Sequence, residues 1–263
     1  MYRPYETLAV ERDGQILTLL FNRPERRNAT NPLMHAELIE AFHTIAKDEE
    51  TRIVVLSGAN GYFSAGGDVD DMLANSGNHQ RWIEAMKEAR EILYAMLDIP
   101  QPIIARVNGH AMGLASTLAL FCDITVMQED AKIADPHVKV GLVAGDGGSL
   151  MWPTLIGYAR AKELLLTGDA LTGAEAARIG LISHAVPKDQ LEAKVAGIAA
   201  RILANPKFAV IGTKRAINMG LRSRLDEVID GHLGLETLSY LTDDYREAMR
   251  AFVEKRPPVF TGK

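Results

Sequence analysis

Residues Pro102 to Asp123 read PIIARVNGHAMGLASTLALFCD, and the predicted fold is organised around this stretch. Its apolar run Ile103–Val107, bounded by proline upstream and by Asn108-Gly109 downstream, predicts a short buried strand. A turn of small residues, 109–113, precedes Leu114–Phe121, which is apolar nearly all round and predicts a buried helix. Strand, glycine turn and helix together can aim unpaired main-chain N–H groups at a negative ligand. A plain strand-to-helix connection is the equally weighted alternative.

The composition is that of an ordinary globular chain. Its 263 residues are 47% hydrophobic and 24% charged, which is enough to bury a substantial core. The net charge of −5 argues against a nucleic-acid partner. Cys122 is the only cysteine, so no internal disulfide can form. No apolar run reaches the length of a membrane span and the N-terminus has no apolar signal core, so we expect a cytoplasmic protein without a membrane partner.

The flanking segments predict mixed strands and helices up to residue 204. Ile53–Leu56 predicts a buried strand, and the loop 58–68 after it is built from small residues. The paired glycines in this loop, Gly66 and Gly67, let another backbone or a ligand approach closely. A long helix is predicted over His79–Asp98.

From residue 205 the pattern is helical only, with helices predicted over 207–218, 225–241 and 243–254. We therefore divide the chain into a mixed α/β core, residues 1–204, and a C-terminal helical segment, residues 205–263. Three helices on so short a segment bury more surface against another subunit than against one another, so we expect an oligomer.

Two sets of residues are candidates for chemistry. Arg26 and Arg27 lie in a proline-containing loop and could hold phosphates, although by themselves they favour the alternative of a solvated charge cluster. His137 and Asp146 lie in an irregular, glycine-rich segment. A histidine beside a buried carboxylate is the usual arrangement of a general base. The alternative is an exposed histidine and an aspartate that caps the next helix.

In this order and spacing, the motifs resemble the enoyl-CoA hydratase/isomerase, or crotonase, superfamily. The motifs, which span almost the whole chain, are Asn22-Arg23-Pro24 with Asn28-Ala29, Phe63–Asp68, Asn108–Gly113, Gly145–Gly148, Leu166–Gly168, Ala176–Leu181 and Glu254–Phe260. The resemblance implies an α/β fold, a crotonase-like spiral of ββα units with a C-terminal helical trimerisation segment. It also implies a homotrimer or a hexamer formed as a dimer of trimers.

The resemblance further implies an acyl-CoA substrate, with CoA as part of the substrate, no separate cofactor and no metal. Its signature is an oxyanion hole for the thioester oxygen of an enolate, and the two main-chain N–H donors map to Gly67 and Leu114. We expect CoA or the acyl group to contact Arg26, Arg27, Ala65, Asp68, Met112, Thr117 and Trp152.

One departure from the family pattern bears on the reaction. Hydratases of this family use two glutamates, and their positions map here to Thr117 and His137. Threonine cannot act as a general base near neutral pH, and hydration needs one group to activate water and another to return a proton. The sequence therefore argues against ordinary enoyl-CoA hydration.

His137, with an aspartate nine residues later, is instead similar to the β-diketone hydrolases of the superfamily, such as 6-oxocamphor hydrolase. This likeness implies a retro-Claisen cleavage in which His137 activates water and Asp146 orients the ring. A further histidine of those hydrolases has no counterpart here, and Leu114 lies near its expected place. Glu236 is interpreted as part of a solvated helix face, with a contribution to the site as the alternative.

The favoured hypothesis is therefore an enolate-forming enzyme that cleaves a C–C bond of a β-dicarbonyl or acyl-CoA substrate with a His137–Asp146 base. An enoyl-CoA hydratase or isomerase that works with His137 in place of glutamate is the second hypothesis. A non-catalytic CoA-binding homologue is the third. The apolar residues expected in the pocket indicate an apolar acyl group but do not identify it.

Overall fold

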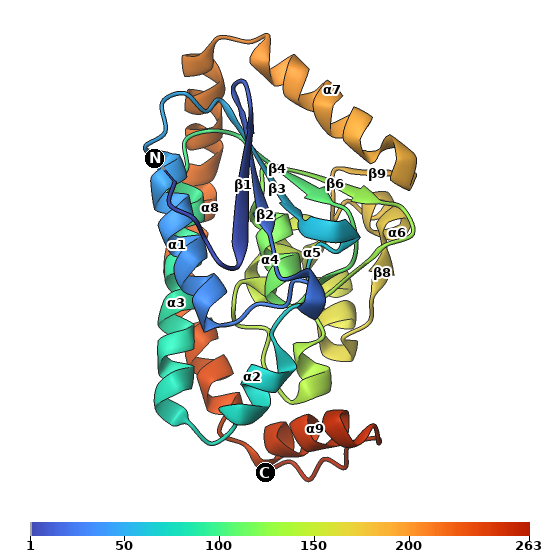
Figure 1. The fold of residues 1–263 in the computed structure, drawn as a ribbon. Helices are drawn as coiled ribbons and strands as arrows, with labels where there is room; N and C mark the ends of the chain where they lie inside the picture. Colours follow the sequence, from blue (N-terminus) through green and yellow to red (C-terminus); the bar gives the residue numbers. More distant parts are fainter. Residues whose placement is uncertain (1) are drawn as a thin grey trace.

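The structure is a computed structural model that describes residues 2–263, and its centre is a six-stranded sheet (Figure 1). The strands, in their order across the sheet, are β1 (Leu8–Asp13), β2 (Ile16–Phe21), β3 (Ile53–Gly58), β4 (Ile103–Val107), β6 (Ile124–Gln128) and β9 (His184–Val186). The first two strands form an antiparallel hairpin, and every later pairing is parallel. The sequence predicts β3 and β4 because each is an apolar run bounded by turn residues.

A small second sheet turns the chain into the predicted spiral. It consists of β5 (Ala111–Met112), β7 (Lys132–Ala134) and β8 (Leu171–Thr172), in the order β5-β7-β8. After β4 and after β6 the chain passes through a strand of this small sheet before its next helix, whereas after β3 it makes only an isolated bridge, Ser64–Ala111, before α2. The β4-β5-α4 unit is the clearest case, because α4 (Leu114–Phe121) follows β5 directly. The expected α/β fold with ββα units and a helical C-terminal part is confirmed.

The helices surround the large sheet (Figure 1). The remaining α-helices are α1 (Pro32–Ala46), α2 (Val69–Ala74), α3 (His79–Asp98), α5 (Gly148–Thr167), α6 (Gly173–Arg178), α7 (Leu191–Leu203), α8 (Lys207–Ser239) and α9 (Asp243–Glu254). Short 3-10 helices are η1 (Pro24–Arg26), η2 (Ala59–Gly61), η3 (His137–Val140) and η4 (Lys188–Gln190). The two helices expected over 207–218 and 225–241 are one helix of 33 residues, α8. A glycine within a helix costs only about 1 kcal/mol relative to alanine, so Gly220 does not break it.

Both faces of the large sheet are covered, as the continuous apolar run of β3 predicts. Alternate residues of a strand point to opposite faces. Ile53 and Val55 therefore belong to a smaller core under α7, whereas Val54 and Leu56 belong to the main core. The main core also holds the buried faces of α1, α3 and α4.

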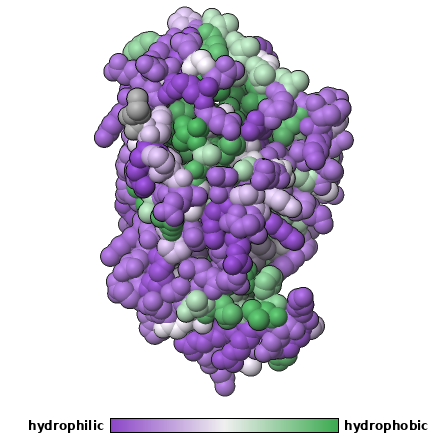
Figure 2. All heavy atoms as spheres, viewed as in Figure 1, coloured by the Kyte–Doolittle hydropathy of each residue, from purple (hydrophilic) through white to green (hydrophobic). Residues whose placement is uncertain are grey.

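Helix α9 lies at one end of the molecule, and apolar atoms gather where it meets the body (Figure 2). Its contacts are with α2 and η3. Within residues 2–263, no helix is by itself long and apolar enough to cross a membrane, and only the bent pair 188–203 and 207–239, at 107°, meets the length and composition criteria together.

Asn28 joins the loop after β2 to the loop after β3. It is fully buried with a φ of 56°. Its side-chain oxygen accepts a hydrogen bond from the Arg23 N–H at 2.8 Å, and its amide donates to the carbonyls of Ala59 and Tyr62 at 3.2 and 2.8 Å. The neighbouring Arg27 carbonyl accepts from the Ala65 N–H at 3.1 Å. Asn28 therefore holds two loops that both reach the cavity described below.

We predict that Asn28→Ala lowers the free energy of unfolding by about 3 kcal/mol, because buried polar groups lose their partners in a backbone conformation that alanine disfavours. Urea denaturation measures this. Asn60 has a similar φ of 53° but is exposed, so Asn60→Ala should cost only about 1 kcal/mol. Equal losses in the two variants would show that the buried hydrogen bonds contribute nothing.

Candidate active site

A cavity of about 550 Å³ lies between α2, α3, η3 and the C-terminal helices. Most of the residues that the sequence singled out line it, namely Arg26, Arg27, Ala65, Gly67, Asp68, Met112, Leu114, His137 and Asp146. Glu236 also lines it. Trp152 is fully buried and lies outside the lining, which corrects the expectation that it contacts the substrate. Its place in the hydrophobic core accounts for the difference.

Two loops that follow neighbouring parallel strands meet at the cavity wall. Ser64 and Ala111 form a parallel bridge, in which the Ser64 N–H donates to the His110 carbonyl at 3.0 Å. The Met112 N–H donates to the Ser64 carbonyl at 3.2 Å. A Cβ on Gly66 would lie 2.8 Å from the Met112 carbonyl oxygen, so only glycine permits this approach. The pairing brings Gly67 and the start of α4 to the same cavity.

The N–H groups of Gly67 and Leu114 are the candidate anion-binding donors. Among the main-chain hydrogen bonds recorded for residues 2–263, none is donated by either group. Leu114 is the first residue of α4, so its N–H has no acceptor within the helix. Gly113 before it adopts φ 54° and ψ −127°, a conformation that glycine reaches readily. Two free donors in one cavity are suited to an oxygen that gains negative charge.

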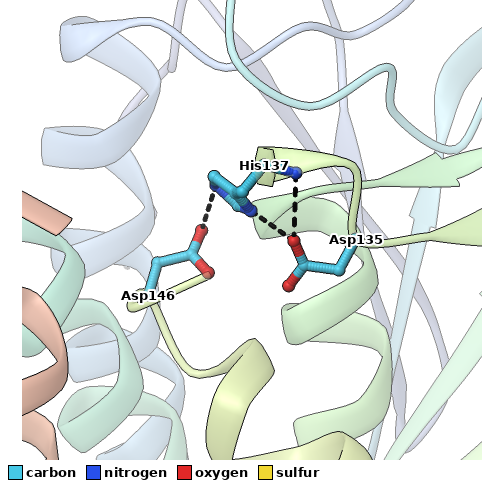
Figure 3. A group of neighbouring side chains, drawn as sticks. All are labelled: Asp135, His137 and Asp146. Carbon is cyan, nitrogen blue, oxygen red and sulfur yellow. Dashed lines mark hydrogen bonds and ion pairs between the residues drawn. The ribbon is translucent and has the colours of Figure 1, made fainter. Parts of the chain in front are cut away.

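His137 lies between two carboxylates on opposite sides of its ring (Figure 3). Its Nδ1 forms a hydrogen bond with Asp135 Oδ1, and its Nε2 lies 3.6 Å from Asp146 Oδ2. Ligand-type atoms of all three residues lie within 4.8 Å of one another. The sequence interpretation made Asp146 the residue that orients the ring, whereas the hydrogen-bonded carboxylate is Asp135 at the end of β7. Asp135 was not singled out from the sequence.

Glu236 brings a third carboxylate from α8. Its Oε1 lies 4.0 Å from His137 Nε2, and the residue is only 2% exposed. The interpretation of Glu236 as part of a solvated helix face was therefore wrong. Its isolation within the apolar run 233–241 was the signal that could have identified it. The Tyr240 hydroxyl donates a hydrogen bond to Oε1 at 3.4 Å.

Thr117 lies behind Asp146 rather than in the cavity lining. It is fully buried, and its hydroxyl donates to Asp146 Oδ1 at 3.4 Å. The glycines around Asp146 permit this packing, because a Cβ on Gly145 would lie 2.8 Å from Glu236 Cβ. A Cβ on Gly147 would lie 2.7 Å from Thr117 Cγ2. The glycine-rich segment thus lets Asp146 approach the other site residues.

Burial and mutual charge set the protonation of the group. Burial raises the pKa of Glu236 to about 8, and the charge of Asp146 adds to the effect. Burial alone would lower the pKa of His137, but Asp135 and Asp146 hold it well above its usual value. Burial also raises the pKa of Asp146, and the His137 charge opposes that rise. Near neutral pH the site therefore contains a protonated Glu236 beside an imidazolium.

The mouth of the cavity is rich in charge. Arg26 is about half exposed and pairs with Asp70 at 2.5 Å. Asp68 is largely buried, accepts from the Asp70 N–H at the start of α2 and pairs with Arg23 at 2.9 Å. Arg26 can therefore meet an anionic ligand at the rim, whereas Asp68 is already used within the fold.

Comparisons with known proteins agree over nearly the full chain. Residues 11–263 match the family model for enoyl-CoA hydratase/isomerase. A crotonyl-CoA hydratase of Syntrophomonas wolfei is 32% identical over 260 residues, 98% of this chain and 99% of that protein. A 1,2-epoxyphenylacetyl-CoA isomerase of Escherichia coli is 34% identical over 250 residues, 94% and 95% of the two chains. The crystal structure of an enoyl-CoA hydratase/isomerase from Mycobacterium paratuberculosis is similar with a TM-score of 0.90 and 35% identity, covering 95% and 99%.

The raised pKa of Glu236 predicts a pH-dependent stability. Because the folded state keeps a proton that the unfolded state releases above about pH 4.5, stability should fall as pH rises from about 5 to 8, by up to about 1.4 kcal/mol per pH unit. Glu236→Gln removes this loss, so its stability relative to the parent should rise with pH. Urea denaturation across this range measures it, with exposed Glu227→Gln on the same helix as the matched control. If the difference in unfolding free energy between Glu236→Gln and the parent does not change with pH, Glu236 is not a buried, protonated carboxyl group in the folded state.

Proposed function

This chain belongs to the enoyl-CoA hydratase/isomerase family, and we propose that it acts on an acyl-CoA thioester through an enolate held by the Gly67 and Leu114 N–H groups. The observation that carries the proposal is the pair of free main-chain donors in one cavity with a buried acid–base group. An oxyanion gains more from such donors than the ground-state carbonyl does, so they lower the barrier to enolate formation.

The reaction that we propose is hydration or double-bond isomerisation of an enoyl-CoA. Two relatives are named as a crotonyl-CoA hydratase and a 1,2-epoxyphenylacetyl-CoA isomerase, which favours this alternative over the C–C hydrolysis that the sequence favoured. The CoA portion enters as part of the substrate. Arg26, Arg27 and Ala65 at the cavity are its proposed contacts.

Asp146 and Glu236 supply the two carboxyl groups that hydration requires. In the proposed hydration, ionised Asp146 takes a proton from water as the water oxygen bonds to the β-carbon. The π electrons move onto the thioester oxygen at Gly67 and Leu114. Protonated Glu236 then gives its proton to the α-carbon, and the thioester carbonyl re-forms. Two carboxyl groups with different proton affinity in one site are a recurrent acid–base arrangement.

His137 acts in this scheme as a positioning residue. Its imidazolium lies between Asp135 and Asp146 and favours the ionised form of Asp146. Asp135 holds the ring by its Nδ1 atom, which fixes where Nε2 points. Thr117, at the position of one family glutamate, then supports Asp146 with a hydrogen bond and needs no acid–base role of its own.

C–C hydrolysis of a β-dicarbonyl remains the second candidate, on one specific observation. His137 Nε2 faces Asp146 Oδ2 at 3.6 Å, and the two residues keep the spacing that resembles the β-diketone hydrolases. That reaction needs the neutral form of His137, which its raised pKa disfavours near neutral pH. Neutral His137 would take a proton from water as the water oxygen attacks a carbonyl carbon; the C–C bond then breaks to leave an enolate in the oxyanion hole, and the imidazolium returns the proton to the enolate carbon.

We also propose that the protein assembles as a trimer or a dimer of trimers through its C-terminal segment. Phe208, Ile217 and Met219 on α8 are 88%, 69% and 73% exposed in the single chain. Large apolar side chains in such numbers on one helix indicate a surface that another protein covers. Light scattering coupled to size-exclusion chromatography tests this assembly.

The oxyanion hole can be tested at a single N–H group. Proline is tolerated at the first position of a helix, so Leu114→Pro should remove the donor and keep α4. We predict a fall in kcat of about 10²–10³. Leu114→Ala keeps the N–H and is the matched control for the lost side chain. Circular dichroism checks the fold, and equal activities of the two variants would remove Leu114 from the oxyanion hole.

The acid–base assignment and the reaction can be tested together. We expect crotonyl-CoA or a longer enoyl-CoA to be turned over with solvent deuterium entering the α-carbon, detected by mass spectrometry. Glu236→Gln should lower that turnover by about 10²–10⁴, because the proton donor is lost while the shape is kept. Cleavage of a cyclic β-diketone that exceeds turnover of every enoyl-CoA, and that collapses in His137→Ala, would instead establish the second candidate.

A further inference from the structure

Helix α2 follows the Gly67 donor almost directly, and little in its own sequence holds it in place. It runs for six residues, Val69–Ala74, and none of them is buried. A helix this short is not stable by itself in water, so it depends on tertiary contacts. Among the described elements, α2 makes its largest contact with α9. The position of the segment that follows Gly67 therefore depends on the C-terminal helix.

Tyr245 on α9 provides a hydrogen bond in that contact. The residue is fully buried, and its hydroxyl donates to the Met72 carbonyl at 3.3 Å. Met72 lies in the last turn of α2, where main-chain carbonyls have no acceptor role within the helix. The next N–H beyond the helix, that of Ser76, donates to the Leu73 carbonyl at 3.2 Å. The Tyr245 hydroxyl thus satisfies a carbonyl that α2 itself leaves unpaired.

Met72 carries this contact on to the proposed oxyanion hole. A Cβ on Gly67 would lie 2.9 Å from Met72 Sδ, so the thioether packs against the glycine. The residues on either side of Gly67 are bonded to Thr30: the Thr30 N–H donates to the Gly66 carbonyl at 2.7 Å, and the Asp68 N–H donates to the Thr30 carbonyl at 2.8 Å. These bonds leave the Gly67 N–H free. A displacement of Met72 would therefore act on Gly67 itself.

The main chain of Tyr245 meets the segment that carries His137. The short helix η3 begins at His137 and ends before Gly141, which adopts a φ of 74°. A Cβ on Gly141 would lie 3.0 Å from the Tyr245 nitrogen, so the absence of a side chain permits the close approach of α9. The Leu142 N–H donates back to the His137 carbonyl at 2.9 Å. One residue of α9 thus contacts both α2 and η3.

Aromatic contacts hold the Tyr245 ring. It meets Trp82 of α3 edge to face, with the centroids 6.0 Å apart and the planes at 86°. It meets Tyr240 of α8 in the same way, at 5.0 Å and 74°. Such edge-to-face pairs stabilise beyond the area that they bury. A phenylalanine at position 245 would keep both ring contacts, so its only direct loss would be the bond to Met72.

We propose that Tyr245 is a positioning residue for the enolate chemistry, because its hydroxyl holds α2 against Gly67 while its main chain packs on the segment of His137. This proposal rests on the acyl-CoA function above and adds a residue that does not itself line the cavity. An oxyanion hole works only if both donors point to the place where the charge develops. A Gly67 N–H that has shifted should therefore stabilise the enolate less well.

The kinetic test removes the hydroxyl and keeps the ring. We expect Tyr245→Phe to lower kcat for an enoyl-CoA about tenfold and to change KM by less than about twofold, because the donor is displaced rather than lost. Tyr94→Phe is the matched control. The Tyr94 hydroxyl also joins two helices, α3 and α8, by donating to Asp226 at 2.6 Å, but Tyr94 does not line the cavity. Equal kcat values in the two variants would overturn the proposal.

The bound enolate gives a readout that a purely structural role would not move. Acetoacetyl-CoA releases a proton from its central carbon to the solvent, and the resulting enolate absorbs in the near ultraviolet. The parent protein should lower the midpoint pH of this ionisation relative to the free ligand. Tyr245→Phe should raise it again by up to about one pH unit, the equivalent of a tenfold loss, and Tyr94→Phe should not. A Tyr245→Phe protein that unfolds at a lower temperature but keeps the parent's midpoint would overturn the proposal.

Gly141→Ala approaches the same contact without altering Tyr245. An alanine Cβ at 3.0 Å from the Tyr245 nitrogen must displace α9 or η3, so the enolate midpoint should rise in this variant too. A midpoint unchanged in both variants would overturn the role of Tyr245 and leave the oxyanion hole in place. If the parent itself does not lower the midpoint of acetoacetyl-CoA, the proposed oxyanion hole fails and the role of Tyr245 fails with it.

Discussion

The parallel bridge between Ser64 and Ala111 is the contact on which the site depends. The strands before these residues, β3 and β4, are parallel neighbours, so the loops after them leave the same edge of the sheet. Their pairing brings the N–H groups of Gly67 and Leu114 to one cavity. Both donors belong to the main chain, so the proposed oxyanion hole would be a property of the fold itself. The side chains around them can then change with the reaction.

The acid–base group illustrates that freedom. The sequence resemblance places the two hydratase glutamates at Thr117 and His137, and in the structure three carboxylates surround the imidazole. Removing one partner from a buried ionic group leaves an uncompensated charge, which is strongly destabilising. The four residues therefore form one unit, in which the neighbouring carboxylates raise the pKa of His137 and burial raises that of Glu236. In the proposed reaction, proton transfer would thus use Asp146 and Glu236 in place of the two family glutamates.

Local sequence pattern predicted the elements far better than it predicted the contacts among them. The strand Ile103–Val107 and the helices Leu114–Phe121 and His79–Asp98 have the predicted bounds, because apolar periodicity and capping residues are local signals. The contacts of Asp135 and Glu236 with His137 were missed. Glu236 lies on a helix far along the chain, where a single charge in an apolar run fits a solvated face equally well. Only the packing of α8 against the site decides between the two.

The boundary at residue 205 separates mixed α/β sequence from purely helical sequence. It does not separate the cavity from the C-terminal segment, because α8 reaches the cavity. Glu236 and Tyr240 reach the cavity from the C-terminal segment, and α9 adds Met249 and Phe252. On α8, Leu235 and Leu238 flank Glu236 in sequence but are 56% and 62% exposed. One helical turn thus carries a buried acid on one side and an unpaired apolar surface on the other. A subunit that covered this surface would restrain the helix that holds the acid, so assembly and proton transfer would depend on the same element.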